Sequence, residues 1–218
     1  MKKFLAVIFA ASAFGAYAQL GVQVGYVYSP SSGNLTLGTF NEFSGTARCN
    51  GFQAGVSYDF SVQGDLGMQV GLQYAYAAGT SREQGRTIMG IQGIQSTTST
   101  YQFLNLPVRV SYSLPVTNHF KFFFFAGPVF SYGISARSKS QIAGVRLLGE
   151  YNNIYKDPLF KDVISPFNLE AGGGLGVLYN HFRLSIGYDQ GILNLYNGNL
   201  SKSKLRRSML GISVGYVF

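Results

Sequence analysis

Charged side chains are scarce in this chain, and six of them fall in segments where bulky apolar residues alternate with small ones. Two of the six, Glu170 and Asp189, would lie on neighbouring strands, as a carboxylate pair for general acid–base catalysis requires. Arg183 lies between them in the sequence and favours ion pairing instead. With three charges of each sign, the set could also form a structural cluster or line a path for protons or ions. The six residues are Asp59, Arg109, Lys121, Glu170, Arg183 and Asp189.

The other residues that could do chemistry form no complete set. His119 and His181 lie beside short predicted turns, where neither has a nucleophile and an orienting carboxylate at the same level. The run Gly172–Gly176 lacks the following helix signal and Lys-Ser/Thr pair of a phosphate loop. Cys49 is the single cysteine, so it has no internal disulfide partner, and we interpret it as a loop thiol. We therefore expect no enzyme activity, no metal and no cofactor.

The elements that would position the six charges are short alternating segments. Period-2 alternation of apolar and small residues predicts β-strands. The connections alternate in length, with long stretches at 30–49, 79–99, 135–165 and 193–204 and tight turns between the other segments. The predicted strands are 20–29, 50–62, 66–78, 100–114, 119–134, 166–178, 182–192 and 205–218.

Composition indicates where the two faces of these strands lie. Hydrophobic residues make up 46% of the chain and charged residues only 12%, with 28 Gly, 15 Tyr and 18 Phe, yet no apolar run is long enough for a membrane-spanning helix. The polar face is too small and too rich in glycine for a solvated exterior, so it belongs inside a narrow barrel whose apolar face meets lipid. Strict alternation of short turns and long loops is typical of transmembrane barrels. The sequence predicts an all-β, eight-stranded, antiparallel, up-and-down transmembrane β-barrel.

One segment, Phe120–Phe125, breaks the alternation. Phe123 and Phe125 would point inward, where the interior glycines leave room for them to plug the lumen. Pro128 would remove a ladder hydrogen bond, which favours a local bulge. Tyrosines near strand ends are typical of the aromatic girdles at the two membrane interfaces: Tyr26, Tyr28, Tyr76, Tyr112, Tyr179 and Tyr216.

Both ends of the chain predict export. Met1-Lys2-Lys3 is a basic region, Phe4–Phe14 is apolar, and Ala16-Tyr17-Ala18 is a cleavage motif, so we expect a signal peptide over 1–18 and a barrel domain over 19–218. The last strand ends on Tyr216 and Phe218, and bacterial outer-membrane barrels commonly end on an aromatic residue that the barrel assembly machinery reads. These features predict a location in the bacterial outer membrane.

The fourth and fifth segments carry a family resemblance. The stretch Tyr101–Tyr112 reads YQFLNLPVRVSY and resembles the YLxIPLLLKY strand of the PorT-like outer-membrane β-barrel family of Bacteroidetes. The stretch Phe124–Pro128 resembles the aromatic-x-G-P pattern of that family's next strand, and the glycine-rich Gly172–Gly176 strand and the aromatic C-terminus fit as well. The resemblance implies a small eight-stranded outer-membrane barrel and supplies no catalytic residues.

The long loops suggest partners. A net charge of +8 in an exported protein favours anionic lipid or polysaccharide over nucleic acid. Basic residues of the last hairpin are candidates for contacts with lipopolysaccharide phosphates, and loop 30–49 could dock a protein or glycan. Loop 135–165 could hide an extra hairpin, with Val145–Tyr151 as the candidate strand. The basic candidates are Lys202, Lys204, Arg206 and Arg207.

These features lead to one main functional hypothesis and three alternatives. A filled interior with long outer loops predicts a non-enzymatic barrel that serves envelope integrity or surface recognition. The inward charges would instead suit a small-solute or ion channel, which the two inward phenylalanines oppose. Resemblance to the PorT-like family implies an accessory of a protein secretion system. An outer-membrane enzyme acting on lipid is the remaining alternative.

Overall fold

The computed structural model describes residues 18–37, 41–88, 91–142, 145–151, 153–157, 163–197 and 204–218. The predicted signal peptide, up to Tyr17, lies outside these residues. None of the described segments is a helix long and apolar enough to cross a membrane. The strands are β1 (Ala18–Leu37), β2 (Asn41–Gln63), β3 (Leu66–Ile88), β4 (Ile91–Pro115), β5 (Phe120–Ile142), β6 (Val145–Tyr151), β7 (Phe167–Tyr179), β8 (Phe182–Gly191), β9 (Lys204–Arg207) and β10 (Met209–Val217).

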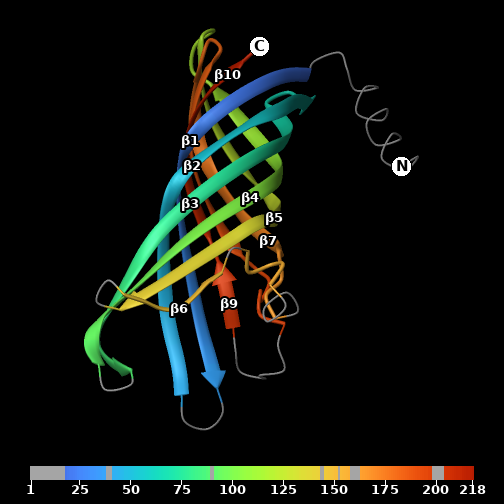
Figure 1. Cartoon of the computed structure of the whole chain (residues 1–218). Coiled ribbons are helices and arrows are strands. Elements are labelled where there is room, and N and C mark those ends of the chain that lie inside the picture. The colour runs from blue at the N-terminus through green and yellow to red at the C-terminus, as the bar shows by residue number, and fades with distance from the viewer. Residues whose placement is uncertain are drawn as a thin grey trace.

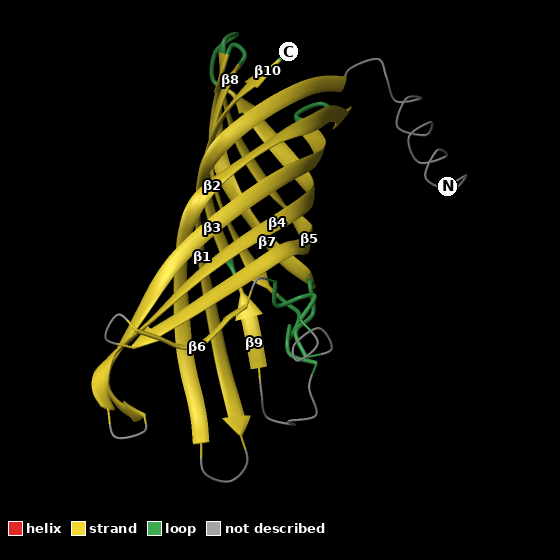
Figure 2. Cartoon of the chain, viewed as in Figure 1, coloured by secondary structure: helices red, strands yellow, loops and turns green. Residues whose placement is uncertain are grey.

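Eight of these strands close into an antiparallel barrel, which confirms the predicted fold (Figures 1 and 2). Neighbours pair in the order β1, β2, β3, β4, β5, β7, β8, β10, and β10 pairs back onto β1 from Gly21↔Val217 to Tyr28↔Leu210. Closure leaves no free edge in the barrel wall. The candidate strand in loop 135–165 exists as β6, but it pairs only with β5 and does not enter the wall. Short β9 continues β10 along β1.

The stretches predicted as long loops are largely paired strands. The β1–β2 ladder runs to Leu37↔Asn41, the β3–β4 ladder to Ile88↔Ile91, and the β5–β6 ladder to Ile142↔Val145. Serine, threonine, glycine and asparagine there weaken the apolar alternation that signals a strand, but backbone pairing needs no apolar face. Beyond Asn50↔Ala78, β2 and β3 no longer pair, so the β1–β2 ribbon separates from the β3–β6 ribbons (Figure 1). We call this end of the barrel the hairpin end.

The opposite end, which we call the turn end, carries the three short connections that the sequence predicts. Gly64 in the β2–β3 turn has φ 55° and Asn180 in the β7–β8 turn has φ 52°, left-handed conformations that glycine and asparagine tolerate. The expected bulge at Pro128 is absent, since β5 keeps its register with β7 through Pro128↔Ala171. The β4–β5 ladder is interrupted instead, between Pro107↔Val129 and Val110↔Ala126, because proline lacks the N–H that would continue it.

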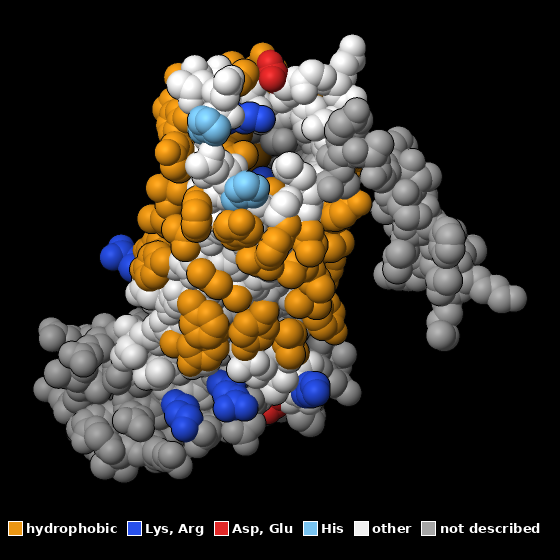
Figure 3. Space-filling model, turned by 90° about the horizontal axis from the view of Figure 1, so that it is seen from above, with side chains coloured by type: hydrophobic (Ala, Val, Ile, Leu, Met, Phe, Trp, Pro, Cys, Tyr) orange, Lys and Arg blue, Asp and Glu red, His pale blue; other side chains and the backbone are white. Residues whose placement is uncertain are grey.

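The outer wall is a band of exposed apolar side chains with basic side chains beyond it at one end (Figure 3). Such exposure would be a liability in water and is what a lipid-facing barrel surface requires. Tyr112 and Tyr179 lie about half exposed on the turn side of the wall, and Tyr26 lies likewise on the hairpin side. Two levels of exposed tyrosine match the predicted aromatic girdles.

Candidate functional site

The lumen is filled by phenylalanine rings that pack against glycine. Phe123 and Phe125 stack with ring centroids 6.0 Å apart on β5. A Cβ atom at Gly176 would lie 2.4 Å from Phe123 Cζ, and one at Gly174 would lie 2.5 Å from Phe125 Cζ. Because the β7 glycines have no side chains, they leave the space that the inward rings occupy, as expected for a narrow eight-stranded barrel.

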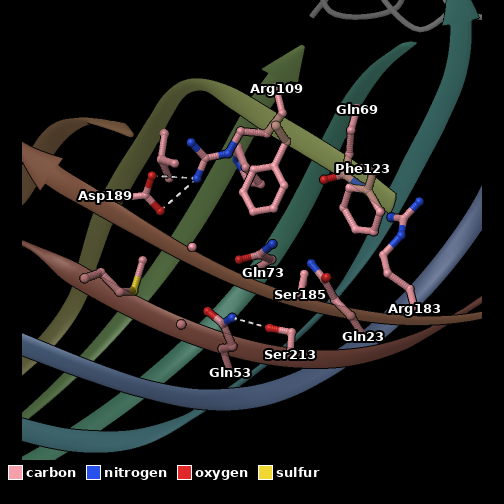
Figure 4. A pocket seen from close by; sticks show the side chains of 16 residues that line it. Gln23, Gln53, Gln69, Gln73, Arg109, Phe123, Arg183, Ser185, Asp189 and Ser213 are labelled. Atoms are coloured by element: carbon pink, nitrogen blue, oxygen red, sulfur yellow. Dashed lines mark hydrogen bonds and ion pairs between the residues drawn. The ribbon is translucent and has the colours of Figure 1, made fainter. Parts of the chain in front are cut away.

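Three arginine–carboxylate pairs cross this interior at successive levels. Arg109 Nη2 contacts both carboxylate oxygens of Asp189 at 2.7 Å (Figure 4). Arg183 Nη1 lies 3.1 Å from Asp59 Oδ2, and Arg207 Nη2 lies 3.1 Å from Glu170 Oε1. Glu170 and Asp189 thus have separate arginine partners and do not share Arg183 as the sequence suggested. A carboxylate pair for acid–base catalysis is not formed between these two residues.

The middle pair is anchored to the interrupted β4–β5 ladder. Arg109 Nη1 donates to the carbonyl oxygen of Gly127 at 2.7 Å and to that of Gly172 at 3.3 Å. The Gly127 carbonyl is available because the ladder breaks beside Pro128. The guanidinium also lies 5.5 Å from the centroid of the Phe125 ring. Charge-assisted hydrogen bonds of this kind satisfy a buried arginine from several sides at once.

Arg207 lies inside the barrel, which corrects its prediction as a lipopolysaccharide contact. It is only 6% exposed, its guanidinium carbon lies 3.7 Å from the Phe103 ring centroid, and Nη2 donates to Ser131 Oγ at 2.6 Å. Lys204 and Arg206 are exposed as predicted, and Lys202 lies outside the described residues. The alternation that places Met209 and Ser213 inward extends back to Arg207, so a signal was present in the sequence.

Arg207 and five residues around it form what we call the sealing layer. Ser131 Oγ donates to Asn105 Oδ1 at 2.6 Å, and Asn168 Nδ2 donates to Glu170 Oε1 at 2.8 Å. All six are buried, and Glu170 has 0% exposed surface. The layer therefore closes the lumen toward the hairpin end. Its members are Phe103, Asn105, Ser131, Asn168, Glu170 and Arg207.

The segment 153–157 covers the barrel mouth beyond the sealing layer. Asn153 Nδ2 donates to the Ile134 carbonyl at 3.1 Å, and Ile154 N donates to the Ala136 carbonyl at 2.8 Å. The Tyr155 ring lies over Gly133, where a Cβ would be 2.4 Å from Cε2. Burial raises the pKa of the Tyr155 hydroxyl above its ordinary value, and the nearby Arg207 charge partly opposes this. The phenol therefore stays protonated and neutral over the covered mouth.

The turn half of the lumen holds polar cavities instead. A cavity of about 60 Å³ beside Arg109 is lined by four glutamines, and Gln53 Nε2 donates to Ser213 Oγ there at 2.7 Å (Figure 4). A second, of about 50 Å³, shares Gln69 and Arg183 with the first, and a third, of about 150 Å³, shares Lys121 with the second. Each is large and polar enough to hold water. Lys121 itself is exposed at the turn end. The glutamines are Gln23, Gln53, Gln69 and Gln73.

Three further residues that the sequence analysis singled out can be placed. Cys49 is not a loop thiol: it lies in β2, is 1% exposed, and shares the inward face of Gly51 and Gln53. The loop interpretation is wrong because β2 continues past the predicted strand start. His119 and His181 are exposed at the turn end, and no group of three potential metal ligands occurs in the part of the chain that the structure covers.

The C-terminal aromatic residues lie at the same end. Tyr216 packs against Phe218 with ring centroids 5.1 Å apart and against Phe182 at 5.4 Å. Both contacts are edge-on, a favourable geometry for aromatic pairs. The role of Tyr216 and Phe218 as an assembly signal stays a prediction.

A closed barrel with an apolar outer band and a polar, filled interior defines the class of outer-membrane β-barrels. The chain belongs to the outer membrane protein beta-barrel domain family, whose family model matches residues 9–197. A comparison with curated protein sequences finds no match.

Three solved structures are similar to the chain in outline. Neisserial surface protein A is 16% identical, with 92% of this chain and 99% of that chain covered and a TM-score of 0.46. OprG from Pseudomonas aeruginosa is 12% identical, with 93% and 96% covered and a TM-score of 0.45. The outer membrane enzyme PagL is 14% identical, with 87% and 98% covered and a TM-score of 0.37. All three TM-scores are below 0.5, so the family assignment rests on the family model.

Proposed function

We propose that this protein is a non-enzymatic outer-membrane barrel that acts in surface recognition and envelope integrity through the ribbons of its hairpin end. The observation that carries the proposal is the sealing layer, since a lumen closed on that side offers no through-path. The β1–β2 and β3–β4 ladders extend past the barrel wall at the hairpin end. Because transmembrane barrels keep their short turns in the periplasm, the hairpin end would face the cell exterior. Surface recognition would then be carried out by the ribbons of the hairpin end.

Anionic lipopolysaccharide is the partner that the exposed basic residues favour. Lys204 and Arg206 are exposed on β9, where basic side chains can pair with phosphate. We expect the double variant Lys204→Gln, Arg206→Gln to bind lipopolysaccharide-containing vesicles more weakly, in a salt-dependent way. Lys121→Gln removes one positive charge at the turn end, on the opposite side of the membrane from lipopolysaccharide, and is the control. Equal binding by all three proteins would remove lipopolysaccharide from the proposal.

Shortening a ribbon tests the broader proposal. The β3–β4 ribbon can be cut back to the pair Ala78↔Thr100 and closed with a two-residue turn, which leaves the wall pairing of β2 with β3 intact. We expect a barrel that still shows heat-modifiable gel mobility but loses surface binding or envelope resistance in cells. The same cut applied to the β5–β6 ribbon shows which ribbon matters. Unchanged binding and resistance after both cuts would contradict the proposal.

A channel is the second candidate, favoured by the cavities of the turn half. We expect no steady single-channel conductance from the refolded protein, because the sealing layer lies across the path. A steady conductance would promote the channel hypothesis over the recognition hypothesis.

Finer membership of the PorT-like family of Bacteroidetes is also a proposal, and it rests on the stretch Tyr101–Tyr112. It would make the protein an accessory of a secretion system. Affinity purification from membranes tests this, and an absence of co-purifying secretion components would count against it.

A further inference from the structure

The largest of the three lumen cavities, about 150 Å³, opens at the turn end and is lined almost entirely by hydrogen-bond donors. Lys121 contributes an ammonium, His119 and His181 contribute imidazoles, and three amide side chains complete the polar lining. His119, Lys121 and His181 are all exposed. The amides belong to Gln19, Asn118 and Asn180.

The charge of this cavity is not balanced. Each of the three interior arginines has a carboxylate within 3.1 Å. Lys121 has no such partner among the described residues, and no acidic side chain lines the cavity in that part of the chain. Asp59 lines the adjoining cavity together with Lys121 but forms no ion pair with it. A site with many hydrogen-bond donors and a cation without an ion-pair partner among the described residues is complementary to a compact anion with several acceptor oxygens.

The donors are held in place by the turns around them. Asn180 N donates to the His119 carbonyl at 2.8 Å, which ties the β5 and β7 ends together, and Val217 N donates to the His181 carbonyl at 2.8 Å. The His181 ring stacks on Tyr216 at 5.5 Å with an interplanar angle of 14°. The His181 ring would therefore lose little freedom when an anion binds.

We propose that the turn-end cavity binds a phosphate group through Lys121, His119 and His181. The group would come from the periplasmic side, either as free inorganic phosphate or as the headgroup of an inner-leaflet phospholipid. This site is distinct from the recognition ribbons at the hairpin end, so the two proposals can fail independently.

The two histidines make the test direct, because they are the only ones in the chain. Protein labelled with ¹³C and ¹⁵N at histidine, purified without a histidine tag, is titrated with inorganic phosphate in micelles at fixed pH, with chloride matching ionic strength. We expect both imidazole signals to shift saturably. Lys121→Gln should weaken binding about tenfold or more, since a charged hydrogen bond is lost. Lys121→Arg should retain binding, and Lys156→Gln, which removes an exposed lysine at the opposite end, is the matched control.

Nanodiscs distinguish the two sources. Shifts with phosphatidylglycerol nanodiscs, absent in phosphatidylcholine nanodiscs and without response to inorganic phosphate, would support the site and assign it to an anionic lipid headgroup. Saturable shifts with inorganic phosphate assign it to the free anion. The proposal is overturned if neither ligand shifts the histidine signals, or if Lys156→Gln weakens binding as much as Lys121→Gln does.

Discussion

The two halves of the lumen use the same pairing, arginine with a carboxylate, in opposite surroundings. In the sealing layer, Arg207 and Glu170 have side chains only 7% and 0% exposed. In the turn half, Arg183 and Asp59 have side chains 13% and 19% exposed and lie beside polar cavities. One pair is dry and the other has room for water.

The difference indicates what each pair does. A buried ion pair gains stability only if its remaining donors and acceptors are satisfied, and loss of one partner leaves an uncompensated charge. Glu170 Oε2 and Asn168 Oδ1 are both buried without a hydrogen-bond partner in the described part of the chain. The sealing layer therefore depends strongly on Arg207. In the turn half, Arg183 Nε is likewise buried without a partner in the described part of the chain, but the cavities beside the pair leave room for water.

The largest expected effect is at Arg207. We expect Arg207→Ala to lower the free energy of unfolding by about 3–5 kcal/mol, because it leaves Glu170 buried and unpaired. Urea-dependent folding equilibria in lipid vesicles measure this. The double variant Glu170→Gln, Arg207→Met, which carries no charge in the layer, should recover part of the loss. A cost below about 1 kcal/mol for Arg207→Ala would mean that the seal is hydrated after all.

A second contrast concerns two phenylalanine rings that each lie against an arginine guanidinium. Phe103 lies in the sealing layer and is almost wholly buried, whereas Phe123 borders the polar cavities. We expect Phe103→Ala to cost about 3–5 kcal/mol of unfolding free energy, because an enclosed cavity is left behind. Phe123→Ala should cost clearly less, since water can enter the space. Equal losses in the same vesicle assay would erase the distinction between the halves.

Strand alternation allowed much of this arrangement to be predicted. It assigned the inward face of β4, β7 and β8, and so anticipated that Arg109, Glu170 and Asp189 share the interior. Partner choice could not be predicted, because it depends on the stagger between strands that are distant in sequence. Arg109 and Asp189 meet across 80 residues, and Arg183 and Asp59 across 124.

The errors have two origins. Cys49 and the ribbon strands lie where polar and small residues obscure the alternation, so the sequence there resembles a loop. Arg207 lies within the predicted strand 205–218, at a position that the alternation directs inward. Backbone pairing continued regardless, because each added pair satisfies N–H and C=O groups without needing an apolar side chain. Continuing the alternation of inward and outward side chains beyond the apolar part of a strand would have placed Arg207 and Cys49 correctly.

The hydrated pair should tolerate removal. We expect Arg183→Gln and Asp59→Asn each to lower the unfolding free energy by about 1–2 kcal/mol, between the costs for exposed and for fully buried ion pairs, because the adjoining cavities leave room for water. Asp59 also accepts from Gln69 Nε2 at 2.7 Å, so its carboxylate keeps a donor when Arg183 is gone. The measurement is the same urea equilibrium used for Arg207→Ala. A loss of several kcal/mol from either substitution would show that the turn half is as dry as the sealing layer.

The prediction with the smallest expected effect compares two positions at opposite ends of the inward face of β2. Cys49 and Ser61 both point inward from β2, Cys49 buried near the hairpin end and Ser61 exposed near the turn end. We expect a water-soluble maleimide to label native Cys49 slowly and to label Ser61→Cys, in a Cys49→Ser background, rapidly, since thiol reactivity requires exposure. Neither substitution should alter heat-modifiable mobility. Rapid labelling of Cys49 in the native barrel would mean that the barrel interior at the hairpin end is open to water. Labelling of Cys49 that accelerates only with Arg207→Ala would identify this arginine as the residue that keeps the layer closed.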